Sequence, residues 1–498
     1  MTQEGNRRER RTTAAALIAL LALAIAAGLA GRAIQPVRAA SPPGVPGTPA
    51  AIAQESSANV YWTAASGAVD TYQVVASPGG ASTIVGGTYL SANVPGLTDA
   101  TAYTFTVTAG SNSAGPGPAS AASNAVVPGR GAFKAVSPAR ILDTRGGSPL
   151  GPGGIRTLSV DGAGGLPASG ISAVWLNVTA TNTTAMGFLA IWPAGLPRPP
   201  TSNLNWTAGR TVPNLVEVAL GVNDQVSFYN SAGSTDLVVD VFGYVALPAS
   251  TATAGMYNPV TPHRVLDTRI GLGASKAQLC AGQVITVKIA GTAGVPSTGA
   301  TAVVLNVTAV NTVVAPSFVT VFPAGTPRPN TSNLNFVPGQ TVANRVVVPL
   351  GSNGSVSFYD FAGHLDVVAD VNGWFTSTAS GGSGFVGVLP IRHLDTRTSP
   401  VLWQGGVLKI LLGPSKFGSV PPTAIVLNVT VTNPTNASWL TVWPDGTPRP
   451  STSDLNYGAG KTVSNLVVVM YGGSPNMLDI YNAFGHIDLI VDFLGWYE

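Results

Sequence analysis

The sequence of 498 residues has few charged residues and only one cysteine, Cys280. Because a single thiol cannot form a disulfide within the chain, each folded unit must be stable through burial of its own core. Charged residues make up 9% of the chain, and the formal net charge is only +3. No basic stripe with interleaved aromatic residues is present, so the sequence predicts no nucleic-acid partner.

Amphipathic helical patterns are also missing after residue 30. The chain contains 59 glycines, 39 prolines and 45% hydrophobic residues, a composition typical of short strands joined by turns. The composition therefore predicts an all-β protein, and the length allows three or four domains of ordinary size.

The N-terminal segment has the layout of an export signal. A cluster of four arginines within residues 7–11 precedes an apolar run over residues 14–30, as a positive n-region precedes an h-region. The run is close to the lower limit for crossing a bilayer, about 17 residues, so it is either cleaved or retained as an anchor. We expect residues 1–40 to be a signal peptide or signal anchor and the protein to be extracellular or at the cell surface.

One block of sequence recurs three times. Each copy begins with Arg-x-Leu-Asp-Thr-Arg and continues with Leu-Asn-Val-Thr, Pro-Arg-Pro, Ser-Asn/Asp-Leu-Asn and a final Asp-x-x-x-Asp-x-x-Gly-aromatic. The period is well above the roughly 20–50 residues of solenoid repeats, so each copy can close its own core. The copies span residues 132–246, 256–376 and 384–498, and small polar residues separate them. Such separators are typical of flexible linkers, which predicts independent domains arranged like beads on a string, with residues 256–376 folding alone as a monomer.

Alternating apolar residues predict the strands of each copy. Val174, Leu176 and Val178 lie on one face of a strand, and Leu237, Val239 and Val241 do so near the end of the copy. With the other alternating segments this gives about eight strands, enough for a two-sheet sandwich with a jelly-roll-like topology. We therefore expect three homologous β-sandwich repeats.

The segment before the repeats has its own recurring signature. Trp62 lies in a short apolar strand, Leu97 precedes Tyr103, and the strand from Ala102 alternates with period two. With these residues, the segment 41–130 resembles a fibronectin type III domain. The resemblance implies a β-sandwich with Trp62 buried and a tyrosine corner at Leu97 and Tyr103, used as a spacer or weak adhesive module. The whole chain is thus expected to be a string of four β-sandwich domains after an N-terminal signal helix.

Six charged positions recur in every copy of this charge-poor chain. Three interpretations are open: structural ion pairs, in which Arg145 or Arg140 binds Asp240 through two hydrogen bonds, a calcium or ligand site, or paired catalytic carboxylates. Asp236 and Asp240 lie about 13 Å apart along one strand, beyond the roughly 5–9.5 Å of glycosidase pairs. We favour structural ion pairs and predict no catalytic residue, metal or cofactor. The predicted pairs involve Arg140, Asp143, Arg145, Asp240, Arg264, Asp267, Arg269, Asp370, Arg392, Asp395, Arg397 and Asp492.

Recurring aromatic residues are the main candidates for binding. Trp192, Phe322 and Trp443 each precede a proline, upstream of the Pro-Arg-Pro segment. If exposed, they can stack on sugar rings, and if buried they belong to the sandwich core. We name Trp192, Phe322, Trp443, Arg198, Arg328 and Arg449 as candidate binding residues. Asn177, Asn306 and Asn428 lie in glycosylation sequons, but their apolar strands favour a strand role over a glycan.

The repeats, taken with their motifs, resemble tandem modules of secreted bacterial surface proteins. That resemblance implies an extracellular location but no ligand. We predict a non-enzymatic, exported surface or matrix protein that makes weak multivalent contacts with cell-wall or environmental polysaccharide or with other surface proteins. The alternative is an accessory binding chain, or an undetected enzyme, of an extracellular polysaccharide-degrading system. Membrane contact is expected only through an uncleaved N-terminal segment.

Overall fold

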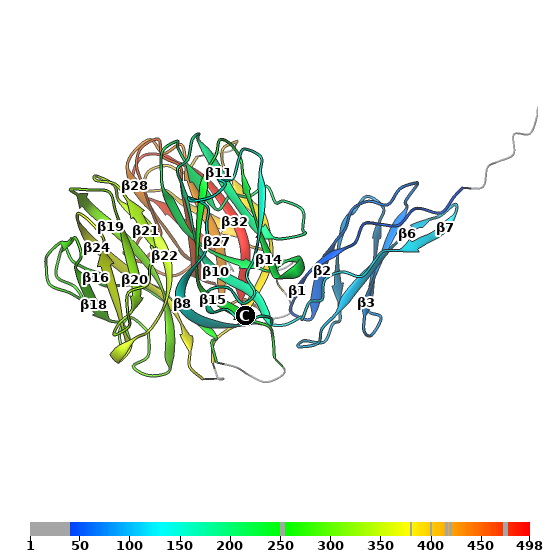
Figure 1. Cartoon of the computed structure of the whole chain (residues 1–498), viewed down its shortest axis with the longest axis horizontal. Helices are drawn as coiled ribbons and strands as arrows, with labels where there is room; N and C mark the ends of the chain where they lie inside the picture. Colours follow the sequence, from blue (N-terminus) through cyan, green and yellow to red (C-terminus); the bar gives the residue numbers. More distant parts are fainter. Residues whose placement is uncertain are drawn as a thin grey trace, which may run out of the picture.

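The computed structural model describes residues 40–249, 254–378, 381–398, 401–413, 417, 421–471 and 477–498. The predicted signal segment lies outside these residues, except for its last one. In the described part the chain is all-β, with three short 3-10 turns, η1 Ala163–Gly165, η2 Val222–Asp224 and η3 Ser352–Gly354. No helix there is long and apolar enough to span a bilayer. Figure 1 shows an elongated N-terminal domain beside a large head made of the three repeats.

The N-terminal domain is a two-sheet sandwich with sheet orders β1-β2-β5 and β4-β3-β6-β7. Its core contains Trp62, and the hydroxyl of Tyr103 accepts a hydrogen bond from the backbone N–H of Thr98 (3.0 Å). Both features were predicted from the sequence. The strands are β1 Ala50–Gln54, β2 Ser57–Tyr61, β3 Thr71–Ser77, β4 Ser82–Gly86, β5 Ser91–Pro95, β6 Thr104–Ser111 and β7 Gly115–Ala119.

Each repeat is a second type of sandwich with two antiparallel sheets. Repeat 1 contains β8 Ala132–Asp143, β9 Ile155–Ser159, β10 Ile171–Thr181, β11 Gly187–Pro193, β12 Leu204–Trp206, β13 Val212–Ala219, β14 Gln225–Asn230 and β15 Asp236–Ala246. Its sheets have the orders β13-β10-β15-β8 and β12-β11-β14-β9. Numbered within the repeat, these orders are 6-3-8-1 and 5-4-7-2, the strand arrangement of a jelly roll.

Repeats 2 and 3 have the same two sheet orders, and β17 adds one further strand in repeat 2. Repeat 2 contains β16 Tyr257–Asp267, β17 Leu279–Cys280, β18 Val284–Lys288, β19 Ala300–Val313, β20 Ser317–Pro323, β21 Leu334–Phe336, β22 Val342–Pro349, β23 Ser355–Asp360 and β24 His364–Thr376. Repeat 3 contains β25 Phe385–Asp395, β26 Val407–Leu411, β27 Ala424–Thr432, β28 Ser438–Pro444, β29 Leu455–Tyr457, β30 Val463–Met470, β31 Met477–Asn482 and β32 Asp488–Tyr497. The predicted jelly-roll-like sandwiches are confirmed.

The two sheets of a repeat differ in burial. We call β13-β10-β15-β8 and its counterparts the inner sheets, because side chains on both of their faces are buried. In β10, Val174 and Leu176 enter the core of repeat 1, whereas Trp175 points to the opposite face and is also buried. Only a neighbouring layer can bury that second face. The inner sheets of the other two repeats provide this layer.

The three repeats share one central core. Its buried residues come from all three inner sheets and include Trp175, Phe242, Val304, Phe375 and Tyr497. Several of these rings touch across repeat boundaries, such as Phe133 of repeat 1 and Phe375 of repeat 2, whose centroids are 4.2 Å apart. The expectation of independent beads on a string is therefore wrong, because a repeat on its own would expose this second apolar face.

Backbone pairing closes the head at the start of each repeat. Gly131 pairs with Phe385, Tyr257 pairs with Ser383, and the N–H of Phe133 donates to the carbonyl of Gly255 (2.9 Å). Each contact joins a residue of one repeat to the residue that directly precedes another repeat, and together the three contacts connect all three repeats in a closed circle. Gly131, Gly255 and Ser383, which directly precede the three repeats, thus take part in this pairing.

The N-terminal domain also packs against the head. Ala50 and Ile52 of β1 join a buried cluster with Ala190, Trp192 and Leu196 of repeat 1. Beside it, Arg130 forms an ion pair with Glu55 (3.4 Å). Figure 1 shows this domain extending from one side of the head, with its far end away from the repeats.

Candidate functional site

The predicted ion pairs form in all three repeats, with one change of partner. Arg140 donates to Asp240 from Nε (2.9 Å) and Nη2 (3.4 Å), and so joins β8 to β15. Arg145 instead binds Asp143 (2.5 Å), with half of its side chain exposed. Of the two partners considered for Asp240, Arg140 is therefore the correct one. The same pattern links Arg264 with Asp370 and Asp267, Arg269 with Asp267, Arg392 with Asp492 and Asp395, and Arg397 with Asp395.

The carboxylates of Asp143 and Asp240 have opposite electrostatic environments. The hydrogen bond from Arg145 is the largest influence on Asp143 and lowers its pKa to about 2. Burial dominates at Asp240 and raises its pKa, although Arg140 opposes the shift. No group of three or more metal-ligating side chains is found among the described residues. The recurrent charges of the predicted ion pairs in repeat 1 are thus paired with one another, and the Arg140–Asp240 pair joins its first strand to its last.

Asp240 and its counterparts also lie at the boundaries between repeats. The backbone N–H of Ser332 in repeat 2 donates to Asp240 of repeat 1. Similarly, Ser202 of repeat 1 donates to Asp492 of repeat 3 (3.2 Å). The Ser-Asn/Asp-Leu-Asn motif therefore contacts the Asp of the last strand in a neighbouring repeat. Two of the recurring motifs are thus parts of one interface.

A third motif contributes asparagines to the same interface. On the third strand of each repeat, the side-chain amide donates to a serine carbonyl of the next repeat, which continues cyclically from repeat 1 to 2, 2 to 3 and 3 to 1. The pairs are Asn177 with Ser332 (2.7 Å), Asn306 with Ser453 (2.6 Å) and Asn428 with Ser202 (2.6 Å). All three asparagines are buried, consistent with the prediction that they are strand residues.

A second set of asparagines completes this arrangement. They lie on the sixth strands and donate to the first set across each boundary, in the pairs Asn344 with Asn177 (2.9 Å), Asn465 with Asn306 (3.0 Å) and Asn214 with Asn428 (2.9 Å). Their carbonyl oxygens accept from the backbone of the neighbouring repeat, as from Leu215 to Asn344 (3.1 Å). We call the six side chains the asparagine ring. It gives the head a pseudo-threefold axis.

Three charged residues near this axis, Arg345, Asp454 and Glu217, break the threefold pattern. Arg345 of repeat 2 occupies the place of Leu215 and Leu466, and it is fully buried. It binds Asp454 of repeat 3 (2.7 Å), where the other repeats have asparagine. Glu217 of repeat 1 occupies the place of Val347 and Val468, and it accepts from the hydroxyl of Tyr497 (2.8 Å). Burial raises the pKa of Glu217 well above its usual value.

The aromatic candidates do not form exposed platforms. Trp192, Phe322 and Trp443 are only 3–5% exposed, and the indole N–H of Trp192 donates to the carbonyl of Leu196 (3.0 Å). Of the two alternatives for these rings, burial is therefore the one observed, and in repeat 1 the N-terminal domain packs against Trp192 as well. The arginines of the Pro-Arg-Pro segments are exposed, and each stacks on a tyrosine of the sheet opposite the inner sheet of its repeat. The pairs are Arg198 on Tyr229, Arg328 on Tyr359 and Arg449 on Tyr481.

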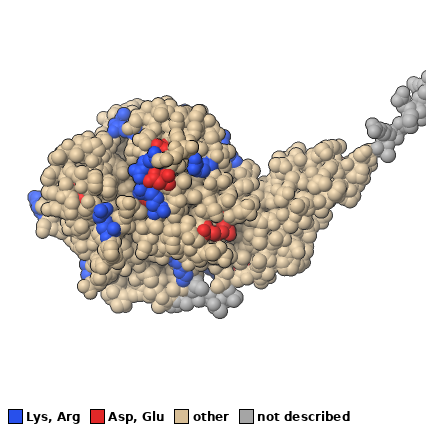
Figure 2. Space-filling model, in the orientation of Figure 1, with Lys and Arg blue, Asp and Glu red and all other residues tan. Residues whose placement is uncertain are grey.

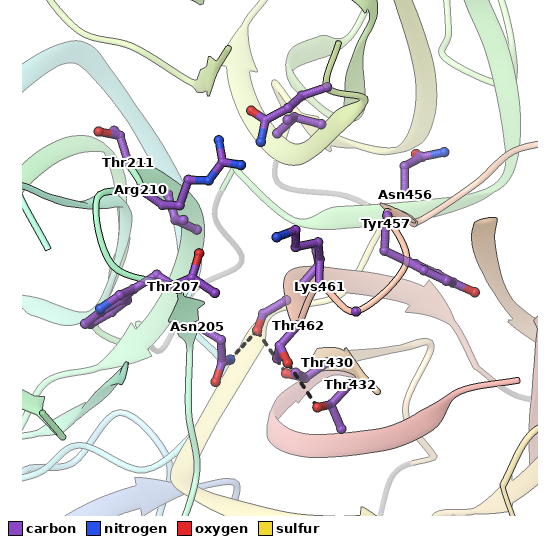
Figure 3. A pocket seen from close by; sticks show the side chains of 18 of the residues that line it. Asn205, Thr207, Arg210, Thr211, Thr430, Thr432, Asn456, Tyr457, Lys461 and Thr462 are labelled. Carbon is purple, nitrogen blue, oxygen red and sulfur yellow. Dashed lines mark hydrogen bonds between the residues drawn. The ribbon is translucent and has the colours of Figure 1, made fainter. Parts of the chain in front are cut away.

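All three repeats line a cavity of ≈ 790 Å³ on the pseudo-threefold axis of the head. Residues of the loop between the fifth and sixth strands of every repeat line it, and these loops span residues 207–211, 337–341 and 458–462. We call it the axial cavity. Figure 3 shows Arg210 and Lys461 extending into the same space from two of these loops, with threonines around them. Strand registers that bring the asparagine ring together also bring these loops together.

Hydrogen bonds fix the polar lining of the axial cavity. Asn205 of repeat 1 donates to the hydroxyl of Ser464 in repeat 3 (2.6 Å), which in turn pairs with Thr430 (3.0 Å). Beside them, Thr432 pairs with Thr462 (3.0 Å). The lining is therefore an ordered array of amides and hydroxyls. Among the described residues that line the cavity, none is acidic.

Charge is sparse on the face of the molecule seen in Figure 2, in keeping with a chain that has 9% charged residues. Figure 2 shows mostly uncharged surface, with basic and acidic side chains in small groups on the head. Near the axial cavity, Arg397 is neutralised by Asp395 (2.5 Å). The remaining cations of the lining are Arg210 and Lys461, for which the described part of the chain provides no ion-pair partner.

Sequence reasoning missed both the asparagine ring and the axial cavity. A signal for the ring was present, because the segments around Asn177, Asn306 and Asn428 are apolar on both faces, as in strands that are buried on both sides. The cavity had no comparable signal, since its equivalent loop positions Arg210, Gln340 and Lys461 differ in every repeat. Of the predicted site residues, only Arg397 lines the cavity.

Comparison with known protein families identifies one of the four domains. Residues 41–126 match the model of the fibronectin type III domain, so the predicted resemblance of this segment is confirmed. The matched region is less than half of the chain. No curated protein matches the chain.

Several solved structures match the chain at low similarity. Titin kinase with its flanking domains is 15% identical, with 25% of this chain and 31% of that one covered and a TM-score of 0.15. The chain thus spans about a third of that structure. Chicken CNTN1 domains FN1–FN3 are 14% identical, with coverages of 68% and 95% and a TM-score of 0.17. A triple jelly roll protein from an archaeal virus is 10% identical, with coverages of 74% and 90% and a TM-score of 0.15.

Proposed function

We propose that this chain, with its fibronectin type III domain as a spacer, is an exported, non-enzymatic surface protein whose three repeats form one saccharide-binding head. The axial cavity is the binding site, and extracellular polysaccharide is the ligand class. This proposal replaces several weak sites on separate domains with one site built by all three repeats.

The axial cavity is the observation that supports this function. Its volume of ≈ 790 Å³ falls in the range of roughly 300–1,000 Å³ that is usual for ligand sites. The asparagine ring and the shared core hold its three loops in place, so the site is formed before a ligand arrives. Such preorganisation lowers the entropic cost of binding.

The polar groups of the cavity suit a sugar. Amide and hydroxyl groups such as Asn205, Thr430 and Thr462 donate and accept hydrogen bonds, as sugar hydroxyls require. Apolar atoms of Pro338, Val342 and Ile490 also line the cavity, and the C–H faces of a sugar can pack on them. No paired carboxylates lie in the described lining to serve as acid and base, which favours binding over hydrolysis.

A cavity-filling variant tests this function. Gly458 lines the cavity, and a Cβ atom at this position makes only ordinary contact with the Lys461 side chain (3.6 Å), so Gly458→Trp should fill the space without straining the backbone. Ala459→Trp is the matched control, because Ala459 is exposed and lies in the same loop but outside the lining. We expect Gly458→Trp to abolish retention on insoluble cell-wall polysaccharide and Ala459→Trp to preserve it.

Two results would contradict the proposal. Either the wild-type chain fails to bind any polysaccharide of a broad panel, or Gly458→Trp binds as well as wild type. Thermal melting of both variants establishes that the head remains folded.

A further inference from the structure

We infer that the axial cavity selects an acidic saccharide, in which a carboxylate or phosphate group is bound by Arg210 and Lys461. This inference rests on the proposed saccharide-binding function and narrows it to a ligand class. The two cations belong to repeats 1 and 3, so the site exists only in the assembled head.

The charge balance of the cavity is the first support. Three cations line it, Arg210, Arg397 and Lys461, and no acidic residue of the described chain does. Arg397 is already neutralised, because Nε and Nη2 both bind Asp395 (2.8 and 2.5 Å). Arg210 and Lys461 have no such partner in the described chain, and a ligand anion would supply the missing charge.

The rarity of unpaired cations in the centre of the head makes this pair notable. Arg345 is paired with Asp454 inside the core, and both arginines of each Arg-x-Leu-Asp-Thr-Arg motif are paired with aspartates. Arg210 and Lys461 differ because they point into a hollow instead of toward a carboxylate, as Figure 3 shows. Opposite charges attract each other more strongly in a hollow of a protein than in bulk water, because the effective dielectric constant there is lower.

The third loop adds a neutral donor at the equivalent position. The side-chain oxygen of Gln340 accepts from the backbone N–H of Val337 (2.9 Å), which leaves its NH₂ group for the cavity. The three equivalent positions thus offer a guanidinium, an ammonium and an amide, all of them hydrogen-bond donors. A guanidinium binds the two oxygens of a carboxylate or phosphate through parallel hydrogen bonds, while the hydroxyl lining suits the sugar that carries the anion.

The double variant Arg210→Gln/Lys461→Gln tests this selectivity, because it gives all three loops the residue that repeat 2 already has. Binding is measured by calorimetry with a uronic-acid polymer, a sugar-phosphate polymer and a neutral polysaccharide. We expect the double variant to lose at least about tenfold in affinity for the polymer that wild type binds best, as removal of charge-assisted hydrogen bonds does. Raising the salt concentration should weaken the wild-type complex as well.

A second double variant controls for net charge. Lys276→Gln/Lys288→Gln removes the same two charges from exposed positions outside the cavity, and it should bind like wild type. Equal losses in both double variants would mean that long-range charge alone attracts the polymer and would overturn the inference. Tight binding of the neutral polysaccharide, unaffected by Arg210→Gln/Lys461→Gln, would overturn acidic selectivity while leaving the proposed function intact. If wild type binds none of the three polymers, both proposals are wrong.

Discussion

The asparagine ring and the apolar core beside it are both built by the three repeats, but the repeats contribute to them in different ways. In the ring, every repeat contributes the same residues with the same partners, such as Asn177 and Asn344 at one boundary. In the core, equivalent positions differ, with Trp175, Val304 and Val426 at one level. The ring therefore defines the geometry of each boundary, whereas the core defines which repeat occupies which place.

This difference follows from the physics of the two regions. A buried amide requires a partner in a fixed direction, and leaving it unpaired costs about 1–3 kcal/mol. Apolar packing has no such directional requirement and tolerates exchanges that conserve volume. The asparagine ring therefore has the same residues in all three repeats. The shared core can instead pack one large aromatic side chain against two small side chains at equivalent positions.

Separating the repeats should have the largest effect. Residues 256–376 expressed alone would expose Tyr257, Val304, Val347 and Phe375 and leave Asn306 and Asn344 without their partners across the boundaries. We expect this fragment to form a trimer or to aggregate, in place of the independent monomer predicted from the linkers. Size-exclusion chromatography with light scattering measures its mass. A stable, folded monomer would show that the ring and the core are dispensable.

The second-largest effect should follow from breaking the Arg345–Asp454 ion pair, which distinguishes the boundary between repeats 2 and 3 from the other two boundaries. Arg345→Leu alone leaves Asp454 buried without its partner and should lower the free energy of unfolding by about 3–5 kcal/mol. Adding Asp454→Asn reproduces the leucine and asparagine found at the other two boundaries, and it should recover most of the loss. Denaturant unfolding of the single and double variants gives the coupling. If the double variant is no more stable than Arg345→Leu, the pair does not explain the difference between boundaries.

Titration of Glu217 should have the smallest effect. Its pKa is raised well above the usual 4.5, so from that pH upward the unfolded chain releases this proton before the folded chain does. Stability from this group is therefore complete at low pH and declines as pH rises toward the folded pKa, by at most about 1.4 kcal/mol per pH unit.

Glu217→Gln removes this titration and keeps an oxygen that can accept from Tyr497. We expect the melting temperature of wild type to fall relative to that of Glu217→Gln between pH 5 and 8. The difference between the two proteins cancels the contribution of other titrating groups, including Glu498. Parallel melting curves across this range would show that Glu217 is not buried in its neutral form.

The sequence predicted each sandwich but not how the sandwiches meet. Alternating residues such as Val174, Leu176 and Val178 identify the face that forms the core of one repeat, because that pattern depends only on local strand geometry. Trp175 and Asn177 lie between them and face other repeats, whose positions depend on contacts distant in sequence. The local pattern of a strand shows that its second face is apolar, but it does not identify the distant segment that covers this face.

The candidate site was predictable only in part. The Arg140–Asp240 pair follows from recurrence and charge complementarity, but recurrence cannot distinguish Arg140 from Arg145, since both lie in one motif. Recurrence does not distinguish a binding role from a core role at Trp192, Phe322 and Trp443, because a bulky aromatic residue recurs for core packing as readily as for ligand binding. It also passes over Arg210 and Lys461, because the loops around the axial cavity differ among the repeats.

Joining the three repeats in one chain has a consequence for the axial cavity. A complex of three identical subunits has to place the same side chain at all three corners of its axis, so any substitution there is made in triplicate. Here the corners are Arg210, Gln340 and Lys461, and each can be altered while the other two are retained. A single polypeptide can therefore present an uneven binding surface to a ligand that itself lacks threefold symmetry, as the successive sugars of a polysaccharide do.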